Sequence, residues 1–159
     1  MINVELAEKV IEALRSRGLT LCTAESCTGG NIAHSITEVA GCSDVFMGGV
    51  VSYDNSVKHN LLDVSNETLE FYGAVSAQVV TQMLSGACKA VGADCAVATS
   101  GIAGPGGGTP EKPVGTVWIG ARMPGKAPRV VLEHFPGDRA DVIEAATNAA
   151  LRLLLDMVI

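Results

Sequence analysis

Residues 19–41 read LTLCTAESCTGGNIAHSITEVAG, and this stretch decides the fold. Leu19 to Thr23 has the apolar character of a short buried strand. Ser26 to Val39 follows as a predicted helix, which small polar residues open and Gly41 ends. Because strands that alternate with helices pair in parallel, the stretch predicts a strand inside the sheet of an α/β protein.

The same alternation continues outward in both directions. An amphipathic helix is predicted over residues 4–17 from apolar positions three and four apart. The further predicted strands are residues 45–53, 94–99, 114–122 and 129–135, and the further helices contain Lys58, begin near Ser65 and Ser76, and span residues 138–158. This order predicts a single three-layer α/β/α domain over residues 1–159, with a mixed, mostly parallel sheet of about five strands.

Composition excludes several classes of function. The chain has 11 Lys and Arg against 17 Asp and Glu, a formal net charge of −6, which argues against nucleic acid or an anionic membrane as partner. The five cysteines include no C-x-x-C pair, and no apolar run reaches the ~20 residues of a membrane span. With no secretory pattern at the N-terminus, a reduced, cytoplasmic protein is predicted.

The first candidate site lies between the strand and the helix of the opening stretch. Ser26 stands at this turn, followed by Thr28, Gly29 and Gly30. A serine beside helix N-terminal N–H groups suits a nucleophile with an oxyanion hole. Two alternatives stay open at this point: Ser26 or Thr28 only caps the helix, or Cys27 is the nucleophile.

The second candidate is the loop over residues 101–113, which is rich in glycine and proline. It follows a strand that ends at Thr99 and Ser100, and ligands of α/β sheets bind at such strand ends. Glycines such as Gly101 and Gly106, together with Thr109, would bring donors close to a phosphate. It lacks the Walker and dinucleotide patterns, and a plain surface loop is the alternative.

Two further segments supply cationic side chains. Lys58 and Tyr53 lie just beyond a predicted strand end, where a lysine in a dry pocket loses its charge readily and can act as a base. Arg139 follows the predicted capping residue Asp138, and a cation in a first helical turn opposes the dipole, which indicates a grip on an anion. A solvent-facing side chain is the alternative for each. The three His and five Cys show no metal-site spacing, so no cofactor is expected.

Taken together, these motifs identify a family. The chain resembles the CinA C-terminal domain family, whose members include nicotinamide-nucleotide amidases, over nearly its whole length. The matching segments are residues 23–30, 49–58, 72–76, 100–105, 113–117 and 137–139. The resemblance implies an α/β/α domain that hydrolyses nicotinamide mononucleotide to nicotinate mononucleotide and ammonia, with no metal or redox cofactor.

The resemblance also implies residue roles. Ser26 would be the nucleophile and Lys58 its base, with Tyr53 assisting. Thr28, Gly29 and Gly30 would stabilise the oxyanion; Ser100, Gly101, Gly106 and Thr109 would line the nucleotide pocket; Arg139 would contact an anion. One departure stands out, since similar sequences often carry an arginine at the position of Ile143.

Two expectations remain beside this reading. The alternative function is a non-catalytic module that binds pyridine nucleotides. Such a module would use the glycine loop for binding and would not need Lys58 as a base. The closing helix carries apolar residues on more than one face between residues 145 and 159. A helix that packs once needs an apolar arc of only about 100°, so a homo-oligomer is expected.

Overall fold

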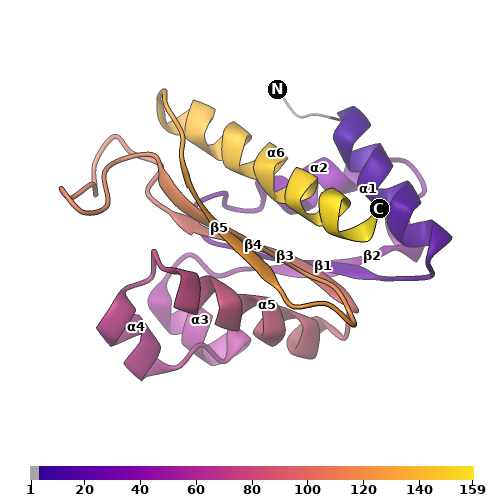
Figure 1. The fold of residues 1–159 in the computed structure, drawn as a ribbon, viewed down its shortest axis with the longest axis horizontal. Helices are drawn as coiled ribbons and strands as arrows, with labels where there is room; N and C mark the ends of the chain where they lie inside the picture. Colours follow the sequence, from indigo (N-terminus) through magenta and orange to yellow (C-terminus); the bar gives the residue numbers. More distant parts are fainter. Residues whose placement is uncertain (1–3) are drawn as a thin grey trace.

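The computed structural model describes residues 4–159, arranged as three layers (Figure 1). The helices are α1 (Val4–Ser16), α2 (Asn31–Thr37), α3 (Asn55–Leu62), α4 (Asn66–Tyr72), α5 (Ala77–Val91) and α6 (Arg139–Val158), with a 3-10 turn η1 (Cys42–Asp44). The strands are β1 (Leu21–Glu25), β2 (Phe46–Val51), β3 (Cys95–Gly101), β4 (Thr116–Arg122) and β5 (Arg129–His134). The predicted order of elements is confirmed.

The sheet has the strand order β2-β1-β3-β4-β5. β1 pairs in parallel with β2 and β3, whereas β4 is antiparallel to both of its neighbours. The mixed, mostly parallel five-stranded sheet is therefore as predicted. Its topology brings the carboxyl ends of β2, β1 and β3 to one edge of the sheet, which is where ligands of α/β sheets bind.

Two apolar cores flank the sheet. Figure 1 shows α1, α2 and α6 on one face and α3, α4 and α5 on the other. Leu14, Ile36 and Leu154 belong to the first core, and Leu62 and Met83 to the second; none of these side chains is more than 1% exposed. Both faces of β1 are covered, and its five residues are all buried, as expected for a central parallel strand.

The start of α2 departs from the sequence prediction. The helix begins at Asn31, five residues after Ser26, and Ser26 to Gly30 form a turn. The cause is local: Gly29 and Gly30 have φ angles of 59° and 100°, in the left-handed region that interrupts a right-handed helix. Ser26 is therefore a turn residue and no helix cap.

The closing helix α6 corrects the argument for an oligomer. Asp138 caps it in a reciprocal capping box with Asp141. Its apolar faces pack on β3 and β4 and also against α1 and α2, so they are covered within the chain. The oligomeric state stays a prediction, now without that support. Within residues 4–159, no helix is both long and apolar enough to span a membrane.

Candidate active site

The first three strands bring polar residues together where they end. Glu25 at the end of β1 lies between Val51 of β2 and Thr99 of β3 in the sheet register. The residues that follow, Ser26 and Ser52, therefore stand side by side at the same edge. Ser26 N donates to Thr99 O at 3.0 Å, and Ser52 N donates to Glu25 O at 2.7 Å. These bonds continue the sheet pairing into the turn and fix where it begins.

Lys58 reaches this point from α3. Asp54 caps the helix by accepting a hydrogen bond from Ser56 N, which sets its first turn beside the end of β2. The Lys58 side chain is 1% exposed, and its Nζ lies 3.0 Å from Ser26 Oγ. Nζ also donates to Ser52 O at 2.8 Å and to Tyr53 O at 3.0 Å. The structure thus brings together the predicted serine and lysine, 32 positions apart.

Burial lowers the pKa of Lys58 below its usual 10.5, and the nearby carboxylate of Asp54 opposes the shift only in part. A neutral amine has two N–H groups and one lone pair. The two carbonyl groups of Ser52 and Tyr53 can only accept, so they take the two N–H groups. The lone pair then faces the third neighbour, Ser26 Oγ, whose hydroxyl hydrogen it can accept.

Cys27 is poorly suited to the role of nucleophile. Its side chain is 6% exposed, and burial raises the pKa of its thiol to about 11. At neutral pH such a thiol is almost entirely protonated, and the thiolate is the reactive form. The amine of Lys58 is hydrogen-bonded to the Ser26 hydroxyl. The geometry therefore favours Ser26 over the rival that the sequence left open.

The turn offers backbone donors, and those of Thr28 and Gly30 are among the three expected from the sequence, whereas Gly29 N donates to Ser26 O. The N–H groups at the start of α2 are occupied, since Ile32 N and Ala33 N donate to the Glu25 carboxylate at 2.8 and 3.0 Å. Across residues 4–159, the Thr28 and Gly30 N–H groups have no acceptor on another residue, and neither has that of Cys27. Free donors beside a candidate nucleophile can receive an oxyanion.

Thr28 itself is 3% exposed, and its hydroxyl is bonded to Glu25 and Thr99, so only its N–H remains for a ligand. Tyr53 is 60% exposed. Its carbonyl oxygen holds Lys58, and its hydroxyl accepts from Arg139 Nη2 at 3.1 Å. The exposed Arg139 also donates from Nη1 to Gly104 O at 2.7 Å. Tyr53 and Arg139 therefore connect α3, α6 and the glycine loop around the serine–lysine pair.

The glycine loop runs from residue 102 to 115 and is anchored at its base. Ile102 N donates to Thr116 O, and Gly115 N donates to Ile102 O. Gly101 is required at the loop entrance, because a Cβ atom there would lie 2.6 Å from Thr116 O. Gly106 is exposed, and a Cβ atom at this position would have no neighbouring atom within 4 Å.

Of the two hydroxyls predicted for the pocket, that of Ser100 has its hydrogen occupied, whereas that of Thr109 is used only as an acceptor. Ser100 Oγ is buried and donates to Ala74 O at 2.8 Å. Thr109 Oγ1 accepts from Lys112 N at 3.0 Å within the loop. The position of Ile143, where similar sequences often carry arginine, packs against the apolar core. Arg139, the loop backbone and the Thr109 hydroxyl hydrogen can therefore donate to an anion.

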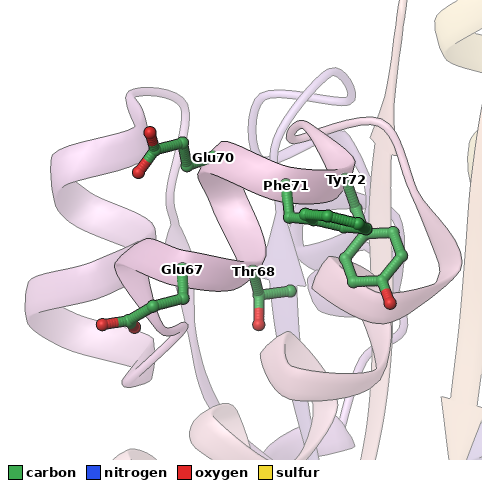
Figure 2. Close-up of a pocket in the computed structure, with 5 residues that line it drawn as sticks. All are labelled: Glu67, Thr68, Glu70, Phe71 and Tyr72. Atoms are coloured by element: carbon green, nitrogen blue, oxygen red, sulfur yellow. The ribbon is translucent and has the colours of Figure 1, made fainter.

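A separate surface pocket of about 750 Å³ lies on α4 and contains none of the predicted residues (Figure 2). It is lined by Glu67, Thr68, Glu70, Phe71 and Tyr72. The rings of Phe71 and Tyr72 meet edge to face with centroids 4.8 Å apart. The pocket lacks a buried nucleophile, so the chemistry is assigned to the strand ends.

Sequence reasoning missed the part played by Glu25, which it quoted inside a motif without a role. A signal existed: a carboxylate precedes a helix whose capping position, Gly30, has no side chain to offer. The bond from Lys58 to the carbonyl group of Ser52 could not be predicted, since backbone acceptors carry no sequence signature. Across residues 4–159 no group of three or more His, Cys, Asp or Glu side chains is arranged to hold a metal ion.

The fold and the buried serine–lysine contact define a class, namely an α/β/α domain with a candidate nucleophile at the end of a parallel strand. Comparison with known proteins makes this specific. The CinA C-terminal domain model matches residues 3–158, and the chain belongs to that family.

Two of the similar proteins carry an enzyme name. A nicotinamide-nucleotide amidohydrolase PncC from Enterobacter agglomerans is 54% identical over 95% of this chain and 92% of its own. The protein of the same name from Escherichia coli K12 is 51% identical with the same coverage. The solved structure of competence/damage inducible protein CihA from Agrobacterium tumefaciens matches with a TM-score of 0.94 and 41% identity, over 97% of this chain and 94% of that one.

Proposed function

We propose that this chain is an amidase that hydrolyses the carboxamide of nicotinamide mononucleotide to nicotinate mononucleotide and ammonia. The observation that carries the proposal is the 3.0 Å contact between Ser26 Oγ and the buried Lys58 Nζ. The names of the relatives that are more than half identical to the chain support this substrate and reaction.

The contacts of Ser26 and Lys58 support the following reaction. Neutral Lys58 takes the hydroxyl proton of Ser26 while Oγ bonds to the carboxamide carbon. The negative charge that forms on the carbonyl oxygen is received by free N–H groups of the 26–30 turn, each worth roughly 3–4 kcal/mol when well placed. Protonated Lys58 then gives its proton to the departing nitrogen, and the C–N bond breaks to release ammonia.

The second half repeats the first with water. The intermediate is an ester of Ser26, and Lys58 is neutral again after the loss of ammonia. It removes a proton from a water molecule, whose oxygen attacks the ester carbon. The bond between that carbon and Ser26 Oγ then breaks, Lys58 returns the proton to Oγ, and the acid is released. The carbonyl groups of Ser52 and Tyr53 hold the amine in place throughout. Arg139 and the loop amides bind the phosphate. Tyr53 links Arg139 to Lys58, because its hydroxyl accepts from Arg139 and its carbonyl oxygen accepts from Lys58.

Two further proposals concern the cellular location and the oligomeric state. All five cysteines are free, which suits the reducing cytoplasm, and we propose that the enzyme acts there. We also propose that it is a homo-oligomer; light scattering at micromolar concentration tests this, and an unchanged single-chain mass on further concentration overturns it.

The deciding experiment incubates the purified protein with nicotinamide mononucleotide and measures ammonia. Ser26→Ala serves as the control, because it removes the nucleophile with minimal change in packing. We expect steady release by the wild type and none above background by the variant. Binding of the nucleotide without ammonia release would instead favour a regulatory module.

A further inference from the structure

The Glu25 side chain is a buried carboxylate with an unusual set of partners. It is 1% exposed and directly precedes Ser26. Oε1 accepts from Thr28 Oγ1 at 2.6 Å and from Ile32 N at 2.8 Å, and Oε2 accepts from Ala33 N at 3.0 Å. In the described part of the chain, no cationic side chain is paired with it. Its charge is stabilised by three hydrogen bonds and by the positive end of α2.

These bonds replace a missing helix cap. Gly30 occupies the capping position of α2 and has no side chain to accept from the first-turn N–H groups. Glu25 supplies the acceptor from the strand on the other side of the turn. The turn over residues 26–30 is therefore held at both ends, by β1 before it and by the Glu25 contact with α2 after it.

A hydroxyl chain fixes the middle of the turn. Thr28 has one hydroxyl hydrogen, and the carboxylate of Glu25 can only accept, so Thr28 donates to Glu25. The 2.8 Å bond between the two threonine hydroxyls is then donated by Thr99. Thr99 also accepts from Ser26 N through its carbonyl oxygen. Both threonine hydroxyl hydrogens and both carboxylate oxygens have partners, which gives the turn one preferred arrangement.

We propose that Glu25 is a positioning residue, which holds the 26–30 turn in the arrangement that leaves the Cys27, Thr28 and Gly30 N–H groups free for the oxyanion. Glu25 also occupies the Ile32 and Ala33 N–H groups, so these do not compete for the oxyanion. The assignment rests on the proposed amidase function. It predicts that loss of the carboxylate lowers kcat and leaves substrate binding unchanged, because Glu25 contacts neither the base nor the loop.

Glu25→Gln is the primary test, since it keeps the shape and replaces one acceptor oxygen by an NH2 group. That group cannot accept from a backbone N–H or from Thr28. We expect kcat for nicotinamide mononucleotide to fall by about 10- to 100-fold, with KM within about twofold of wild type. The pH midpoint of kcat should not move. Thr28→Val should lower kcat in the same direction, and by more than Thr28→Ser, which keeps the hydroxyl that donates to Glu25.

A matched control loosens the same helix without touching the turn. Thr147 Oγ1 on α6 accepts from Asn31 Nδ2 at 2.8 Å, at the first residue of α2. Thr147→Val should lower the melting temperature and keep wild-type kcat. An equal kcat loss in this control would overturn the proposal, because it would assign the effect to general loosening of α2.

Three other results would also overturn it: unchanged kcat in a folded Glu25→Gln, a shifted pH midpoint, or equal kcat in Thr28→Val and Thr28→Ser. The threonine pair decides the matter if Glu25→Gln does not fold. If the wild type releases no ammonia, the proposed function fails, and amide exchange still tests the positioning role. The Gly29 N–H, which donates to Ser26 O at 3.1 Å, should exchange about tenfold faster in Glu25→Gln. Equal exchange would contradict that role.

Discussion

The turn at residues 26–30 and the glycine loop at residues 102–115 lie at the same edge of the sheet and are built in opposite ways. Residues 26 to 28 of the turn are buried and held by a closed hydrogen-bond network. The middle of the loop is exposed, and long side chains from Arg139 and Lys112 tie it to its surroundings. A site organised before substrate arrives serves the chemical step, whereas an exposed loop serves binding.

The difference between the turn and the loop predicts different kinetic effects for variants of each. Changes in the turn or its base should lower kcat, because they act on the transition state. Changes in the loop or its anchors should raise KM with little effect on kcat, because they act on substrate binding. A turn variant that changes only KM, or a loop variant that changes only kcat, would break the division.

The largest effect is expected for Ser26→Ala. Loss of the nucleophile should lower kcat by at least about 1,000-fold, while calorimetry should still detect nucleotide binding of similar affinity. Cys27→Ala is the matched control, since the neighbouring thiol has the raised pKa of a buried group and should be dispensable. Activity that survives in Ser26→Ala and disappears in Cys27→Ala would transfer the nucleophile's role to Cys27.

The second effect concerns Lys58 and pH. The base must be neutral, and the neutral fraction rises as pH rises through the pKa. Because burial lowers the pKa of Lys58, kcat should rise with pH, with its midpoint below the usual lysine pKa of 10.5. Lys58→Arg should lower kcat by about 100- to 10,000-fold, because guanidinium stays protonated. An active Lys58→Arg enzyme, or a rate that falls as pH rises over this range, would remove Lys58 from the mechanism.

Ser26 and Lys58 could be predicted from the sequence as candidate site residues, because small polar residues at strand ends form a recognisable pattern. The order of helices and strands along the chain and the caps at Ser65, Ser76 and Asp138 follow from equally local signals. The start of α2 was missed because two left-handed glycines override the helical spacing around them. The packing of α1 against α6 was missed, because the two helices lie at opposite ends of the sequence.

The proposed role of Glu25 depends neither on a local spacing pattern nor on a contact between distant segments. Its partners lie three to eight residues ahead, across a turn whose path depends on the glycine conformations. Sequence spacing places the carboxylate near the helix and does not say which N–H groups it takes. The free donors of the turn follow only once those bonds are assigned, so the oxyanion site could be predicted as a region and not as particular atoms.

A smaller effect, on binding, is expected for Arg139→Met. Two of the five guanidinium donors are used within the protein, and the rest can reach an anion. Loss of this charged contact should raise KM for nicotinamide mononucleotide about 10- to 100-fold. KM for nicotinamide riboside, which lacks the phosphate, should change little. Arg152→Met is the control, as it removes an exposed arginine from the same helix. Equal KM increases for both substrates would contradict phosphate binding.

The smallest effect tests the loop anchor itself. Lys112 Nζ donates to Tyr72 O at 2.9 Å, at the last residue of α4, where a cation also meets the negative end of the helix. A partly exposed bond of this kind contributes about 1 kcal/mol or less. Lys112→Met should therefore raise KM only about two- to fivefold, with kcat and the melting temperature nearly unchanged. Lys126→Met is the control, because that lysine bonds to Met157 O at the far end of α6. A clear fall in kcat for Lys112→Met would show that the loop takes part in the chemical step, and the division between turn and loop would no longer hold.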